Sequence, residues 1–306
     1  MAGIDITLVG RSGIRWPAHC GLSKGGRTAG LTLVEESVKG LMDAPIETDW
    51  IEDTDGAIFS GERFLPRDLD LGFAFSDELA RSRGGELESQ FRLEFGARAD
   101  RWDPNFKHTR VEVESELSGV RWLEVLLREA PEMKMRQDPY SKQVWELGYA
   151  LRSGDPLFES KKKVTTFETS GASGSGFIEI SNPTDTEMRH TWILTQGTWL
   201  VPDPSWVGAP GKRAPGGEFP TRNVTVTVTA ADQGAKVTRE RRKIHAQTFT
   251  GANLLGRMNG KWVKFDIPPH TPKTLLPISV SGAPSSGARA ELHQPRRWTR
   301  PVGGEL

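Results

Sequence analysis

The sequence is poor in cysteine. Cys20 is the single cysteine among 306 residues, which excludes an internal disulfide framework and any zinc site built from several cysteines. We therefore expect the chain to fold in a reducing compartment. Cys20 lies in a stretch flanked by proline and glycine, where a small apolar residue near a loop is expected rather than a catalytic nucleophile.

Long apolar runs are also missing. No stretch approaches the roughly 18 residues that a membrane-spanning helix needs. The first ten residues contain Asp5 and lack a basic start followed by an apolar block, so the sequence predicts no secretory signal. We expect synthesis in a cytoplasm and no membrane partner.

The chain has no net charge, because 40 basic residues balance 40 acidic ones. A neutral chain has no global field that would attract nucleic acid or an anionic membrane. Nucleic-acid binding by counterion release needs clustered positive charge. The sequence therefore predicts no specific nucleic-acid partner.

Recognisable cofactor and metal motifs are absent as well. No two of the six histidines lie within five residues of each other, so a two-histidine metal spacing does not occur. Asp53, Asp55, Gly56 and Glu62 partly match a calcium loop, but Ile51 occupies the position of the first carboxylate. A solvated acidic loop is the preferred interpretation. We expect no metal, no cofactor and no catalytic centre.

The first half of the chain combines strand patterns with one helix pattern. Strands are expected at 4–9, 31–34 and 68–75, and residues 39–61 are expected to form a loop punctuated by proline and glycine. Leu87, Phe91 and Phe95 recur every four residues, and this spacing predicts a helix near 86–100.

A strand over 111–117 follows, joined through Gly119 to a second strand over 120–128 as an antiparallel hairpin. Its apolar residues alternate with charged ones, so one face is expected to be strongly acidic. The three carboxylates of that face are Glu112, Glu114 and Glu116.

The second half reads as a β sandwich of many short strands. A polar, flexible joint is expected over 161–176, followed by strands at 176–181, 223–229, 275–280 and 288–292. The dipeptide Asn259-Gly260 favours a type I′ hairpin turn between 254–258 and 261–267.

Tryptophan is abundant, with ten residues in the chain. Half of them fall in the second half: Trp192, Trp199, Trp206, Trp262 and Trp298. Core filling or subunit contact is the first interpretation of these side chains. Stacking on sugars is the second, with Trp199 and Trp206 as the candidate glycan contacts.

Several segments together resemble a known family. They are the strand entry Arg67-Asp68-Leu69-Asp70-Leu71, then 119–125, 155–158, 176–183 and 188–194, and the closing Arg296-Arg297-Trp298-Thr299-Arg300-Pro301. In this arrangement the chain resembles the distal tail proteins of siphophages, in particular the minor tail proteins of actinobacteriophages of the mycobacteriophage type.

The resemblance implies a mainly β protein with two domains. Residues 1–162 would form a ring-forming, tail-tube-like β domain with a helix near 86–100. Residues 163–306 would form a galectin-like β-sandwich domain. It further implies a non-enzymatic virion protein at the tail tip, assembled in the host cytoplasm as a hexameric ring that joins the tail tube to the baseplate. The implied partners are other copies of the chain, the tail tube protein and a tail-tip protein, with the genome passing through the lumen without specific contact.

A head-to-tail ring requires two different complementary faces on each copy. The charge pattern predicts Glu112, Glu114 and Glu116 on one face. On the other it predicts Arg67, Arg81 and Arg83. The alternative function is a carbohydrate-binding adhesion module of the tail tip, with a host cell-surface glycan as partner.

Overall fold

The computed structural model describes residues 3–22, 26–82, 85–96, 102–103, 105–133, 138–240 and 243–305. These residues form antiparallel sheets with a few short helices. The predicted mainly β class is confirmed. No helix among the described residues is long and apolar enough to cross a membrane.

The chain divides into two compact units. The first contains the described residues up to Glu159 together with residues 299–303, and the second contains Ser160–Trp298 and the described residues from Gly304 onward. The chain therefore leaves the first unit three residues before the predicted border at 162/163. It also returns to the first unit after Trp298, which a single border does not describe.

The first unit is built from two antiparallel sheet segments with the strand orders β2-β1-β7-β8 and β8-β10-β6-β3, and β9 lies beside β10. A separate two-stranded sheet consists of β4 and β5. The strands are β1 (Ile4–Val9), β2 (Arg15–Cys20), β3 (Leu31–Lys39), β4 (Ile46–Asp53), β5 (Gly56–Phe64), β6 (Arg67–Ser76), β7 (Thr109–Ser115), β8 (Gly119–Leu127), β9 (Glu132–Met133) and β10 (Val144–Ser153).

The core of this unit follows from the alternation that predicted β6. Leu69, Leu71, Phe73 and Phe75 are all buried, because every second side chain of a strand points to the same face. The predicted hairpin of β7 and β8 is likewise confirmed, with antiparallel partners such as Val111 and Leu123.

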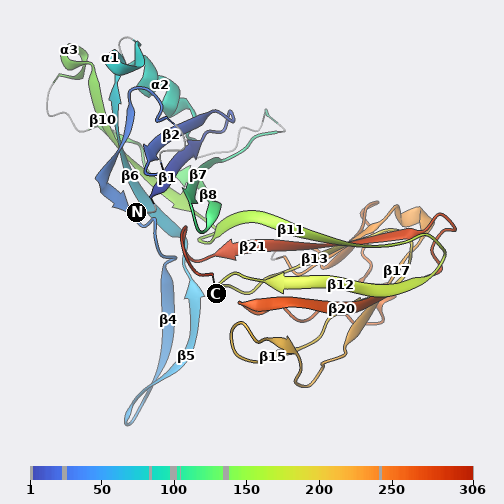
Figure 1. Ribbon diagram of the computed structural model, residues 1–306. Helices are drawn as coiled ribbons and strands as arrows, with labels where there is room; N and C mark the ends of the chain where they lie inside the picture. Colours follow the sequence, from blue (N-terminus) through green and yellow to red (C-terminus); the bar gives the residue numbers. More distant parts are fainter. Residues whose placement is uncertain are drawn as a thin grey trace. The chain divides into compact units, whose positions relative to one another are not determined.

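Helix α2 (Glu86–Leu93) covers this core, and α1 (Asp77–Ala80) and α3 (Pro139–Lys142) lie at the same end of the unit (Figure 1). The Phe91 ring lies 5.0 Å from Phe73 and 5.5 Å from Tyr149. The helix is shorter than predicted. Gly96, a poor helix former, follows soon after its end, and the Glu94 carboxylate accepts hydrogen bonds from Ser12. The end of the predicted helix, 97–100, lies outside the described residues.

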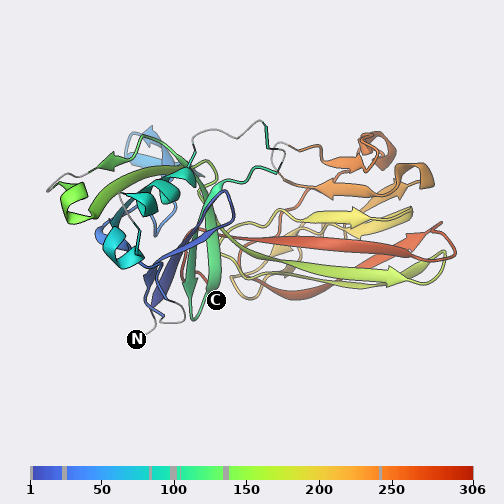
Figure 2. The same ribbon diagram turned by 90° about the horizontal axis from the view of Figure 1, so that it is seen from above.

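The second unit consists of two antiparallel sheets, β19-β18-β13-β21-β11 and β12-β20-β14-β17. Both views show its long strands running lengthwise, with β11 beside β21 (Figures 1 and 2). The strands are β11 (Phe158–Thr169, which starts in the first unit), β12 (Gly174–Asn182), β13 (Thr191–Leu194), β14 (Gly197–Pro202), β15 (Trp206–Val207), β16 (Ala214–Pro215), β17 (Asn223–Val228), β18 (Ala235–Thr238), β19 (Ala246–Thr248), β20 (Thr271–Ser281) and β21 (Ala288–Trp298).

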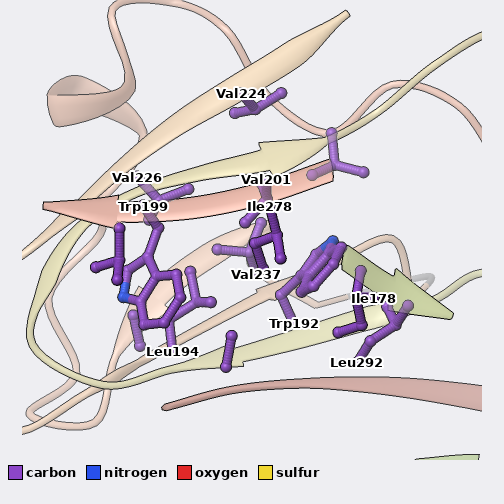
Figure 3. Packing of buried hydrophobic residues seen from close by; sticks show 14 of the residues in the cluster. Ile178, Trp192, Leu194, Trp199, Val201, Val224, Val226, Val237, Ile278 and Leu292 are labelled. Atoms are coloured by element: carbon purple, nitrogen blue, oxygen red, sulfur yellow. The ribbon is translucent and has the colours of Figure 1, made fainter. Parts of the chain in front are cut away.

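One hydrophobic cluster draws on both sheets (Figure 3). Val224, Val226 and Val228 of β17 are buried as their alternation predicts. Trp192 of β13 and Trp199 of β14 are the largest side chains in the cluster, and both are buried. The core-filling interpretation of these two tryptophans is therefore confirmed.

The predicted flexible joint at 161–176 is wrong. Strand β11 continues through the three lysines to Thr169, and β12 begins at Gly174. The Lys163 ammonium pairs with Glu179, and the Thr165 hydroxyl donates to the Glu179 carbonyl at 2.9 Å. These contacts fix a segment whose composition alone resembles a linker.

The predicted hairpin at Asn259-Gly260 is also wrong. Both residues have positive φ, as a type I′ turn requires, but the preceding residues form the 3-10 helix η2 (Leu255–Met258). A second such helix, η1, covers Ala230–Asp232. Ile267 exchanges its backbone hydrogen bonds with Met188 instead, at 2.9 and 3.0 Å. The segment 261–267, which was predicted to pair with 254–258, therefore pairs at its end with Met188.

Candidate subunit interface

The β4–β5 hairpin replaces the loop predicted at 39–61 and projects from the other strands of the first unit (Figure 1). Two features hid it in the sequence. Gly56, with φ of 141°, starts β5 directly after the turn. Gly61 lies beside a register shift between Asp49 and Trp50. Glycines that serve a turn and a bulge in a hairpin look like loop punctuation when read alone.

Apolar side chains lie on both faces of this hairpin. Trp50 pairs with Phe59, and the next pair is Ile51 with Ile58. Paired residues share a face and successive residues alternate between faces. The Trp50 and Phe59 rings meet edge to face with centroids 5.5 Å apart.

All four side chains are more than half exposed: Trp50 58%, Ile51 60%, Ile58 60% and Phe59 51%. We call these four residues the hairpin patch. Large apolar side chains clustered on a surface mark interaction sites, and a lone two-stranded hairpin is only marginally stable in water. The hairpin patch is therefore the first unit's strongest candidate for contact with another protein.

The hairpin also carries most of its charge with one sign. Between Ile46 and Phe64 there is one basic residue, Arg63, which pairs with Glu47 at 2.6 Å. The acidic residues of the same span are Glu47, Asp49, Glu52, Asp53, Asp55 and Glu62. An apolar hairpin with an acidic rim fits a partner surface that offers apolar area and basic side chains.

Arg67 is not a surface residue, which contradicts its predicted place in the interface. Its side chain is fully buried, and the guanidinium donates to the carbonyls of Leu41 and Thr299 at 2.8 and 2.6 Å. Burial lowers its pKa to about 10. No local pattern in the sequence reveals this burial, because the acceptors are main-chain oxygens 26 and 232 positions away.

Of the other two predicted arginines, Arg81 is exposed. It follows α1 as its C-cap with φ of 57°. Arg83 lies outside the described residues. Arg81 thus remains a candidate for the basic side of an interface.

The acidic strand separates into residues with different environments. Glu112 is buried, and its carboxylate meets Arg15 at 2.7 Å and Arg110 at 3.6 Å. It is therefore a structural residue of the first unit, which corrects its assignment to an exposed acidic face. Glu114 is half-buried in β7, and Glu116 is exposed in the turn that follows.

The two candidate glycan contacts do not form a sugar-binding platform. Trp199 is fully buried, and its indole N–H donates to the Thr195 carbonyl at 2.8 Å. This burial contradicts its predicted role. Trp206 is partly buried against the core of the second unit.

Within the described parts of the chain, no group of three or more histidine, cysteine or acidic side chains is arranged to hold a metal. A surface pocket of about 200 Å³ lies in the first unit, between β8 and the end of β10. It is lined in part by His108, Trp122 and Arg152. The acidic residues of the partial calcium-loop match, Asp53, Asp55 and Glu62, lie along the β4–β5 hairpin and not in a loop that closes around an ion.

Known proteins are similar to this chain, some in sequence and others in fold. The minor tail protein Gp27 of Mycobacterium phage D29 is 23% identical over 298 residues, covering 82% of this chain and 84% of the relative. Gp27 of Mycobacterium phage L5 is 24% identical with the same coverage. No protein-family model matches the chain.

Among solved structures, the Dit protein (gp 19.1) of SPP1 is similar to this chain with a TM-score of 0.51. It is 12% identical, and the match covers 95% of this chain and 98% of that one. That protein is described as a paradigm of the hub adsorption apparatus in phages that infect Gram-positive bacteria. The resemblance to mycobacteriophage minor tail proteins is confirmed, and the chain has a Dit-like fold.

Proposed function

We propose that this chain is a distal tail protein of a siphophage, a structural and non-enzymatic component of the virion's tail tip. It joins the tail tube to the baseplate as a ring of identical copies. Two minor tail proteins that match most of its length support this proposal, as does the Dit-like fold. The first unit is the ring-forming, tube-like domain, and the second is a galectin-like sandwich that faces other tail-tip proteins.

The observation that carries the proposal is the hairpin patch. Trp50 and Phe59 on one face and Ile51 and Ile58 on the other are exposed in the isolated chain. A contact that buries one face alone would leave the other apolar pair in water. The geometry favours insertion of the hairpin between surfaces rather than docking of one flat side.

The partner that we assign to the hairpin is a second copy of the chain. A hairpin that reaches out from one copy onto a different surface of the next makes a heterologous contact, and such contacts close into rings when the rotation allows. Six copies in the ring, with the tail tube protein on one side and a tail-tip protein on the other, complete the proposal. Arg81, Glu114 and Glu116 are the remaining charged candidates at its edges.

Photo-crosslinking from the hairpin tests this assignment. A photoreactive phenylalanine in place of Ile58 is expected to give covalent ladders of up to six copies when the purified chain is irradiated at high concentration. The matched control replaces Leu117, which is equally apolar and 86% exposed but lies in the β7–β8 turn. Ladders that are equally strong from both positions, or absent from both, would count against the hairpin as the subunit contact.

The alternative function, a carbohydrate-binding adhesion module, is weakened because Trp199, one of its two candidate glycan contacts, is buried in the core. No arrangement among the described residues favours sugar binding over assembly. A host glycan is therefore not part of the proposed function.

A further inference from the structure

Residues 299–303, which we call the return segment, pack with the first unit although Ser160–Trp298 of the second unit precede them in the chain. Pro301 in the middle of the segment is buried. Most of the second unit, Ser160–Trp298, is thus inserted between two parts of the first. This order of the chain gives the return segment a role that a loose terminal tail does not have.

Two buried arginines hold the return segment by its main chain. Arg67 donates to the Thr299 carbonyl at 2.6 Å. Arg121 donates to the carbonyls of Arg300 and Gly303 at 2.9 and 2.7 Å. Both guanidinium groups belong to side chains with no exposed area, so water cannot replace these acceptors at low cost.

Main-chain donors and a hydroxyl complete the contact. The Ala44 amide donates to the Thr299 carbonyl at 2.9 Å. The Gly303 amide donates to the Ser118 hydroxyl at 2.9 Å. The segment is therefore bound along its backbone from several strands and loops of the first unit, in the way that a receptor holds an extended peptide.

Arg67 connects the return segment to the start of β11. Its guanidinium carbon lies 4.9 Å from the centroid of the Phe158 ring, the second-last residue before the chain enters the second unit. The same guanidinium binds Thr299, the first residue after the chain comes back. One buried side chain thus contacts the first unit's chain both just before it leaves, at Phe158, and where it returns, at Thr299.

We propose that the return segment is an intramolecular ligand of the first unit, with Arg67 and Arg121 as its receptor residues. Without the segment, two buried guanidinium groups lose their carbonyl acceptors, and removing the partner of a buried charge is strongly destabilising. The first unit therefore completes its fold only after the second unit has been synthesised. If the first unit forms the ring as proposed above, ring assembly also waits for this step.

Two glycine substitutions in the full-length chain separate this proposal from a passive tail. Gly303 in the return segment and Gly282 in the second unit both have positive φ, of 80° and 63°. An added Cβ has no contact closer than 3.8 Å at Gly303 and none within 4 Å at Gly282. Gly303→Ala and Gly282→Ala thus introduce the same backbone strain in different units.

Hydrogen exchange followed by mass spectrometry on the monomer gives the readout. Gly303→Ala is expected to speed exchange in β6 and β8 about tenfold while β17 and β20 stay unchanged, and Gly282→Ala is expected to do the reverse. Arg121→Met should act like Gly303→Ala, with Arg128→Met at an exposed ion pair as its control.

Faster exchange confined to residues 299–303 in the Gly303→Ala chain would overturn the proposal, because the segment would then be a tail that the first unit does not need. If Arg121→Met fails to fold, the glycine pair still decides, since it leaves the receptor intact. The measurement does not depend on ring formation, so it can succeed or fail separately from the proposed function.

Discussion

At the scale of single residues, the largest differences between prediction and structure are side chains that were expected at the surface and are buried. Trp199 was a candidate glycan contact and Arg67 a candidate interface residue, yet both are among the largest fully buried side chains. The Trp199 indole N–H donates to one main-chain carbonyl, and the Arg67 guanidinium donates to two. Buried polar atoms need such partners, and main-chain partners leave no signature in the sequence.

The tryptophans supply a test at this scale. Trp199→Ala is expected to lower the free energy of unfolding of the second unit by about 4 kcal/mol, because it opens a large cavity in a packed core. Trp262, which is 48% exposed, is the matched control, and Trp262→Ala should change stability by less than about 0.5 kcal/mol. Chemical denaturation followed by circular dichroism measures both, and equal effects would contradict the assigned burial.

His190 gives the second unit a pH dependence. It is buried, neither ring nitrogen has a hydrogen-bond partner among the described residues, and its ring meets that of Trp192 edge to face with centroids 6.1 Å apart. Burial lowers its pKa from 6.5 to about 4, while nearby Asp266 opposes this shift and Arg239 adds to it. The folded state therefore keeps His190 neutral over a pH range in which the unfolded chain takes up a proton.

The sign follows from linkage. Between pH 6.5 and about 4 the unfolded state binds more protons at this site, so stability falls as the pH falls through this window. The full effect is on the order of 3 kcal/mol. His190→Leu should flatten the loss of stability between pH 7 and pH 4.5 relative to the unaltered chain. Thermal unfolding at several pH values measures this, and parallel curves would rule out His190 as the source.

Glu112 and Glu116 offer another matched comparison, because the first is buried and the second is exposed. Reversal of Glu112 to lysine places a cation beside Arg15 and Arg110 at a buried position, and we expect it to destabilise the first unit by about 3 kcal/mol. Glu116→Lys changes an exposed turn and should leave stability almost unchanged. Denaturant titration separates the two, and a stable Glu112→Lys chain would return Glu112 to the list of surface residues.

At the scale of elements, the β4–β5 hairpin differs from the other long strands of the first unit, because it does not join their sheets. Its strands pair with each other and form a sheet of their own. Substituting its apolar residues should therefore affect association rather than the folded core. This separates it from β6, whose apolar side chains are buried.

A paired substitution tests that difference. Trp50→Ala is expected to change the unfolding free energy of the first unit by less than about 1 kcal/mol while weakening self-association at least tenfold. Phe73→Ala in β6 should cost about 4 kcal/mol in stability. Sedimentation velocity and denaturant titration on the same samples give both quantities. A Trp50→Ala chain that associates normally would remove the hairpin from the interface.

The strands that could be predicted from the sequence are those with one apolar face and one polar face. In β6 and β17 apolar residues alternate with polar ones, and both strands were located within a residue or two. The hairpin failed this test because Trp50 and Ile51 place apolar groups on opposite faces, which removes the period-2 signal. The lysines of β11 and the helix η2 were misread because long-range contacts decide their conformation.

The interface candidates depended on still longer-range information. Charge pattern located Glu116 and Arg81 on the surface but did not reveal that Glu112 and Arg67 are buried. The return segment brings residues 299–303 to partners more than 170 positions earlier in the chain. Contacts of this separation follow from topology, which no local pattern encodes.

At the scale of the whole molecule, most of the second unit, Ser160–Trp298, is inserted between two parts of the first. The first unit carries the exposed hairpin and is closed by the return segment. The second has a continuous hydrophobic cluster of its own. This division of labour suits an assembly protein, in which one module makes the repeated contact and the other is free to meet different neighbours.

The most direct test of the central claim is electron microscopy of the purified chain at high concentration, alone and with tail tube protein. We predict rings of six copies with a central opening, and their loss in a chain that carries Trp50→Ala and Ile58→Ala. Monomers under both conditions, or rings that form equally well with the double substitution, would contradict the account.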